Sequence, residues 1–193
     1  MDSKELLAPY SFSSDGKLLS VVQVVNRQIE IVPVEQQGDE LKPGVRQVLV
    51  AGPSVNLPVL SPDGKWLAYT SAESGPTEVY VRSASASQSG RWQISNNGGN
   101  LPRWSRDGRA LVYQSGDRLM SASYSVQGDT FVPGTSRVWI DKLGTEEQWD
   151  LAPDDKRVIA IVPVEEQQAP QADHEITILF NFFDELKRKV PVP

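Results

Sequence analysis

The sequence has no cysteine and one histidine, His174, in 193 residues. The absence of cysteine excludes disulfides, thiol nucleophiles and cysteine-ligated metals, and a lone histidine excludes multi-histidine zinc sites. A Ser-His-Asp triad has no histidine to use anywhere else in the chain. The composition therefore argues against most enzyme classes.

Positive charge is also scarce. The 19 basic residues are scattered and outnumbered by 25 acidic ones, giving a net charge of −6, which argues against nucleic acid as a partner because phosphates are bound by clustered Lys and Arg. No apolar run approaches the length of a membrane span, and the N-terminus lacks an apolar secretory signal. We expect no membrane insertion and, for the chain as written, a cytoplasmic location.

An internal repeat is the strongest signal in the sequence. Aspartates 15, 63, 107 and 154 are separated by 48, 44 and 47 residues, and each is followed by a turn residue and an apolar strand. The first three are followed by glycine, whereas the fourth is followed by Asp155. The four segments are Ser13–Leu19, Ser61–Leu67, Ser105–Leu111 and Ala152–Val158.

Each repeat reads as a small antiparallel sheet. An Asp-Gly pair between apolar runs is a hairpin signal, and β-branched and aromatic residues fill the segments that follow. Four short strands at this period predict a β-propeller rather than a sandwich. The predicted fold is therefore all-β, one domain over residues 1–193, with about four four-stranded blades.

The predicted blades cover residues 8–50, 55–96, 100–141 and 146–181. The last unit has three strands of its own, so we expect an N-terminal strand at residues 4–7 to close it, since ring closure protects sheet edges. Residues 181–190 read as a short C-terminal helix, with acids before bases and Pro191 after it. An open arc would instead expose two sheet edges and self-associate.

At these residues the chain resembles the TolB-type, WD40-like β-propeller repeats of bacteria. The run Leu60–Ser71 is close to that family's repeat core. The segments 78–82, 92–95, 102–109 and 181–191 resemble more narrowly the C-terminal propeller regions of bacterial serine/threonine protein kinases. This resemblance implies a non-catalytic sensing or scaffolding module, extracytoplasmic if it belongs to a membrane-anchored kinase.

The sequence departs from these relatives in two ways. It has no Gly-rich phosphate loop, no His-Arg-Asp loop and no Asp-Phe-Gly motif, so no kinase is present. It also shows four repeats, whereas TolB-type propellers usually have six or more blades. The chain is then either a compact four-bladed form or part of a longer propeller.

The candidate chemistry is sparse. The repeated aspartates do not form an Asp-x-Asp-x-Asp loop, so we interpret them as turn residues bonded to their own backbone rather than as calcium ligands. The pairs Glu146-Glu147 and Glu165-Glu166 read as solvated loops, and His174 reads as a surface residue. We predict no catalytic residue, no metal and no cofactor.

Tryptophans on the predicted strands are expected to pack between blades. Two of them, Trp104 and Trp149, precede an aspartate turn and are alternatively placed at the mouth of a central channel. Their neighbours Arg103 and Asp150 would supply polar groups for a ligand there. These four residues are the binding-site candidates.

The predicted function is a non-catalytic interaction or sensor module that binds a protein or peptide, or a small ligand, on its loop face. The alternatives are the non-catalytic propeller of a prolyl-oligopeptidase-like peptidase and a small-molecule-binding propeller. No Gly-x-Ser-x-Gly elbow is present, so a peptidase domain is not part of this chain.

Overall fold

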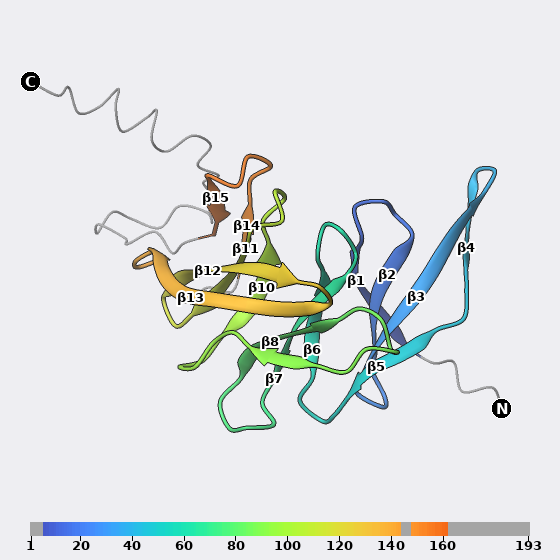
Figure 1. Cartoon of the computed structure of the whole chain (residues 1–193), viewed down its shortest axis with the longest axis horizontal. Coiled ribbons are helices and arrows are strands. Elements are labelled where there is room, and N and C mark those ends of the chain that lie inside the picture. Colours follow the sequence, from blue (N-terminus) through green and yellow to red (C-terminus); the bar gives the residue numbers. More distant parts are fainter. Residues whose placement is uncertain (1–5, 144–147, 162–193) are drawn as a thin grey trace, which may run out of the picture.

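The computed structural model describes residues 6–143 and 148–161, and every regular element in them is a strand. Three sheets of antiparallel strands and one strand pair follow one another along the chain (Figure 1). The predicted all-β propeller fold is confirmed. The predicted helix at 181–190 and the strands expected beyond residue 161 lie outside the described residues.

The first sheet has the order β1-β2-β3-β5, and β4 pairs with the far half of β3. Because β3 is ten residues long, its second half leaves the sheet with β4 as a projecting hairpin (Figure 1). The strands are β1 (Leu7–Phe12), β2 (Leu18–Gln23), β3 (Gln28–Gln37), β4 (Glu40–Pro43) and β5 (Gln47–Ala51).

The second and third sheets each have four strands in sequence order. The second contains β6 (Asn56–Leu60), β7 (Trp66–Ser71), β8 (Glu78–Ser83) and β9 (Arg91–Gln93). The third contains β10 (Asn100–Trp104), β11 (Ala110–Ser115), β12 (Arg118–Gln127) and β13 (Thr130–Ile140). The last pair is β14 (Trp149–Leu151) with β15 (Val158–Ala160).

The repeated turn is held by one hydrogen-bond pattern. In the second sheet the Ser61 hydroxyl donates to Asp63 Oδ1 at 2.6 Å and accepts from the Trp66 amide at 2.9 Å. The Lys65 amide donates to the same Asp63 oxygen at 3.1 Å, and Gly64 has φ +69°. All four aspartates accept an amide two residues ahead at 3.1 Å, which confirms the turn interpretation.

The hydrophobic core lies between successive sheets. On β7, Leu67 and Tyr69 face the first sheet, whereas Trp66 and Ala68 face the third. Both faces of the second sheet are thus covered, and all six residues of β7 are buried. This is why the repeat reads as a continuous apolar run rather than as alternation.

Of the strand predicted at residues 4–7 to close the last blade, the described residues Leu6 and Leu7 lie in the first sheet instead. Leu7 begins β1 and pairs with Gln23 of β2, and the Val24 amide donates to the Leu6 carbonyl. These two residues therefore extend the first strand of the first sheet, because β2 offers them a full set of ladder partners. Residues 1–5 lie outside the described residues. Within the described part, no helix is long and apolar enough to cross a membrane.

Candidate functional site

Three of the four predicted site residues meet through their side chains, Arg103 from β10 and Trp149 and Asp150 from β14. The Arg103 guanidinium stands over the Trp149 ring at 5.9 Å from its centroid, and Arg103 Nε lies 3.5 Å from Asp150 Oδ1. Arg103 also donates from Nη1 to the Pro102 carbonyl at 3.0 Å. Asp150 is exposed, so the ion pair is solvated and contributes little to stability.

Trp104 points the other way, because neighbouring residues on a strand face opposite sides. It is buried between the second and third sheets, where its Nε1 donates to the Val59 carbonyl at 2.9 Å. Trp149 is also buried, in the core between the third sheet and the last pair. The structure thus places both tryptophans in interblade cores, the packing role first expected for them, and leaves Arg103 and Asp150 as the polar groups there.

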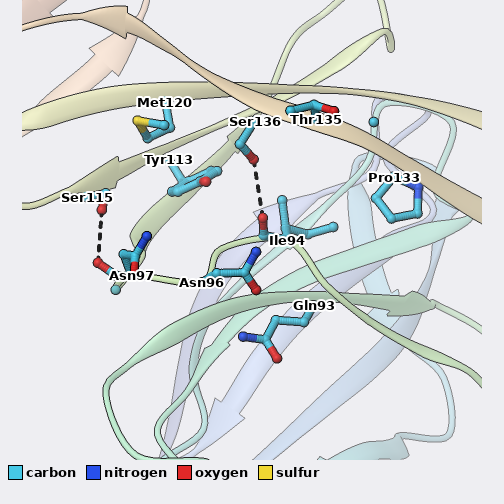
Figure 2. Close-up of a pocket in the computed structure, with 12 residues that line it drawn as sticks. Gln93, Ile94, Asn96, Asn97, Tyr113, Ser115, Met120, Pro133, Thr135 and Ser136 are labelled. Atoms are coloured by element: carbon cyan, nitrogen blue, oxygen red, sulfur yellow. Dashed lines mark hydrogen bonds between the residues drawn. The ribbon is translucent and has the colours of Figure 1, made fainter.

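A hollow with a volume of about 430 Å³ lies elsewhere, between the outer parts of the second and third sheets. We call it the interblade groove (Figure 2). None of its lining residues carries a charge. Its polar side chains are Gln93, Asn96, Asn97, Ser115, Thr135 and Ser136, and its apolar lining includes Ile94, Tyr113, Met120 and Pro133.

Two hydrogen bonds cross the groove from sheet to sheet. The Ser136 hydroxyl of β13 donates to the Ile94 carbonyl at 3.2 Å, and the Ser115 hydroxyl of β11 donates to the Asn97 carbonyl at 3.3 Å (Figure 2). The loop after β9 is therefore attached to the third sheet at two points. This attachment sets the spacing of the two walls.

A buried carboxylate holds that loop from behind. Glu78 accepts the Gly98 amide at 3.0 Å and also accepts the Ser95 hydroxyl. Ser95 Oγ in turn accepts the Val79 amide at 2.7 Å, and Gly98 adopts φ +83°, a conformation natural to glycine. The side-chain amides of Asn96 and Asn97 are thus carried on a fixed backbone, and both are exposed at the groove.

Tyr113 on β11 provides the aromatic part of the groove lining. Burial raises the pKa of its phenol, a hydrogen bond with Ser136 opposes that rise, and the nearby Glu78 carboxylate adds to it. The hydroxyl therefore stays neutral at physiological pH. The groove can donate and accept hydrogen bonds through amides and hydroxyls, and its lining contains no Asp, Glu, His, Lys or Arg.

Residues 93–98 and 133–136 were not predicted as a site. The run Asn97-Gly98-Gly99-Asn100 reads in the sequence as a turn into the next repeat. Asn96 and Asn97 nevertheless place two successive amide side chains on a short connection, which is a signal for a polar contact surface. The opposite wall had no such signal. Within residues 6–143 and 148–161, no three Asp, Glu or His side chains are grouped so as to hold a metal ion.

Comparison with protein-family models gives no match, and comparison with curated proteins gives none either. Solved structures do match the fold. TolB from Acinetobacter baumannii superposes with a TM-score of 0.58 at 20% identity, over 84% of this chain and 39% of that one. A putative TolB from Agrobacterium tumefaciens gives 0.54 at 20% identity, over 84% and 61% of the two chains.

The β-propeller domain of the Trilobed protease from Pyrococcus furiosus gives a TM-score of 0.52 at 14% identity, over 91% of this chain and 57% of that domain. At these identities the likeness concerns the fold alone. The chain is a TolB-like β-propeller in architecture, and it spans less than two thirds of the length of these three structures.

Proposed function

We propose that this chain is a non-catalytic propeller module that binds a neutral, polar segment of a protein or peptide in the interblade groove. One observation carries the proposal: a hollow of about 430 Å³ between two blades, lined by uncharged hydrogen-bonding side chains on a fixed backbone. Peptide main chain needs such donors and acceptors, and a preformed surface lowers the entropy lost on binding.

We infer further that the module is of the kind attached to bacterial serine/threonine kinases. The support is the sequence resemblance of the segments around Glu78–Arg82 and Pro102–Arg109 to such propellers. In that setting the groove would recognise a signal-bearing peptide or protein, and the kinase would be supplied by another part of the parent protein.

The test is selection of peptides from a random phage-displayed library on the whole chain. Enriched peptides should bind the Asn96→Ala/Asn97→Ala variant at least roughly tenfold more weakly, because truncating two central amides removes more than 1.4 kcal/mol. A matched control, Gln47→Ala, changes an exposed amide in the first sheet and should bind like the wild type.

Two outcomes would contradict the proposal that the interblade groove binds a peptide. The first is a library that yields no enriched peptide. The second is binding that survives the double variant but is lost on Arg103→Ala or Asp150→Ala. That second result would instead support the channel-mouth site predicted from the sequence.

A second candidate function is a small-molecule site. The groove volume lies within the range of about 300–1,000 Å³ usual for ligand pockets. A panel of neutral polar metabolites, screened by thermal shift, would then give a stabilising compound whose effect disappears in the Asn96→Ala/Asn97→Ala variant.

The remaining alternative is a propeller that controls substrate access to a peptidase domain. Its support is the fold shared with the protease propeller domain.

A further inference from the structure

The contacts between sheets follow a rule that repeats along the chain. The residue just before the Ser or Ala of each turn motif faces the preceding sheet. Leu60 is buried in the core shared with the first sheet, Trp104 in the core shared with the second, and Leu151 packs on the core shared with the third. Phe12 has the same position in the first sheet, and it is 51% exposed.

A second repeat concerns the long hairpins of the first and third sheets, β3–β4 and β12–β13. Both carry Gln-Gly-Asp at the tip and Pro-Gly shortly after it, at residues 37–39 and 43–44 and again at 127–129 and 133–134. Two residues past each aspartate stand Leu41 and Phe131. Phe131 is buried against Trp66 and Trp92 of the second sheet, with ring centroids 5.2 and 5.7 Å apart.

Leu41 belongs to none of the core clusters formed by the described residues, and it is 60% exposed. Phe12 and Leu41 therefore both occupy positions that, in the third sheet, are buried by the sheet before it. We call the surface around these two residues the Phe12 face. It carries the apolar half of an interblade contact whose other half is missing from the described part of the chain.

At the other end of the described chain, the residues that would face a following sheet are exposed. Counted from the turn motif, Ile159 is equivalent to Ser20, Ala68 and Val112, all of which are buried against the following sheet. The next outward position, Ile161, is equivalent to Val22, Thr70 and Gln114, which are buried as well.

Ile159 and Ile161 themselves are 40% and 54% exposed. The Ile161 amide donates to the Gln148 carbonyl at 3.0 Å, so the side chain is held in the register of the sheet. We call this surface the Ile159 face. In an interblade contact, the equivalent surface of each earlier sheet packs on the sheet that follows it.

The two faces lie at opposite ends of the molecule. In Figure 1, β14 and β15 stand at one end of the row of sheets, and β1 stands in the sheet at the other end. Within the described residues they are therefore separated by the second and third sheets. A second copy of the chain can supply the missing partner, because its Ile159 face has the residue positions that pack on the Phe12 position in the other interblade contacts.

We propose that the Ile159 face of one copy packs on the Phe12 face of another, in the arrangement by which each sheet packs on the next within the chain. The contact is head-to-tail, since it joins two different surfaces. We expect both contacts to form between the same two copies and to close a ring of two. Because both faces are apolar and each copy carries a net charge of −6, added salt should strengthen the association by screening repulsion.

The test measures mass by light scattering and sedimentation of the whole chain over a wide concentration range. The wild type should dimerise. Phe12→Asp and Ile159→Asp should each weaken dimerisation by at least roughly tenfold, because an unpaired carboxylate replaces a buried apolar contact. The control Val25→Asp changes a valine that is 72% exposed outside both faces and should behave as the wild type.

Mixing the two disrupted variants gives the decisive result. The Phe12→Asp copy keeps an intact Ile159 face, and the Ile159→Asp copy keeps an intact Phe12 face, so a head-to-tail contact predicts one heterodimer and nothing larger. Thermal melting of each variant checks that it folds. No heterodimer from two folded variants overturns the proposal.

A wild type that stays monomeric at every concentration also overturns it. Solvent protection of Phe12 in that monomer would mean that the chain's own remaining residues cover the face.

Discussion

At the scale of single residues, the serine of the turn motif joins the turn aspartate to the start of the next strand. In the first three units its hydroxyl donates to the turn aspartate at 2.6–2.7 Å and accepts the amide that begins the next strand at 2.9–3.0 Å. The fourth unit has Ala152 at this position and lacks the hydroxyl bonds. Its Asp154 still accepts the Lys156 amide at 3.1 Å, and it also accepts Arg157 Nε at 2.8 Å.

Replacing Ser61 by alanine should lower the free energy of unfolding by about 1–3 kcal/mol, because the buried Trp66 amide loses its side-chain acceptor. Urea denaturation of the whole chain measures the change. Ser89→Ala, at an exposed loop position, is the matched control and should have no measurable effect. Equal losses in both variants would contradict the role assigned to Ser61.

The turn glycines allow a second comparison, between Gly16 and Gly64. Both have φ near +70°, so alanine at either position should cost roughly 1–2 kcal/mol in backbone strain. A Cβ at Gly16 would meet no atom within 4 Å, whereas one at Gly64 would lie 3.3 Å from Ser13 Cβ of the first sheet.

Gly64→Ala should therefore be less stable than Gly16→Ala by about a further 1 kcal/mol, from crowding between sheets. Thermal and urea unfolding of the two variants side by side measure the difference. Identical stabilities would mean that the first two sheets can separate slightly at this turn without cost.

At the scale of the element, the second and third sheets are stabilised because both of their faces are covered by neighbouring sheets. The aromatic cluster between the second and third sheets shows this, since Phe131 has four aromatic neighbours, among them Trp66 and Tyr124. The long β12–β13 hairpin places the Phe131 side chain against Trp66 and Trp92 of the second sheet.

Phe131→Ala should accordingly destabilise the chain by about 3–5 kcal/mol through loss of burial and the cavity left behind. Leu41→Ala, at the equivalent and exposed position of the first sheet, should change the free energy of unfolding by less than about 0.5 kcal/mol. Denaturation at low protein concentration measures both. A large effect of Leu41→Ala under those conditions would show that its face is covered within the monomer.

At the scale of the whole molecule, the turn aspartates should make stability sensitive to acid. The hydroxyl of Ser13 lowers the pKa of Asp15 and that of Ser105 lowers the pKa of Asp107, while the Lys156 amide lowers the pKa of Asp154. A carboxyl whose pKa is lower in the folded state stabilises the fold above its unfolded pKa, near 3.9.

That contribution is lost as the pH falls through the lowered folded values, so the urea midpoint should drop as the pH is taken below about 4. The Asp15→Asn/Asp107→Asn variant should show a shallower drop, because two of the linked protonations are gone. Measuring urea midpoints at several pH values tests this. Parallel pH profiles for wild type and variant would show that other groups cause the acid sensitivity.

Much of the candidate chemistry could not be found from the sequence. Arg103, Trp149 and Asp150 were predicted together because they lie on the strands that precede two aspartate turns, and the first strands of adjacent blades come close together. The interblade groove was missed because Asn97 and Ser136 are far apart in sequence and belong to different blades. Only the packing of one sheet on the next brings them into one surface.

The sequence by itself determined the unit of this protein: four turn motifs at a near-constant period, each followed by short strands. Local chemistry suffices for that, since the Ser-Asp-Gly turn is held by hydrogen bonds within a few residues. Tertiary structure alone decided which strand Leu7 joins, where the groove opens and which apolar residues stay exposed. Those outcomes depend on which sheets pack against each other, and the residues within one repeat do not determine which sheet lies next to it.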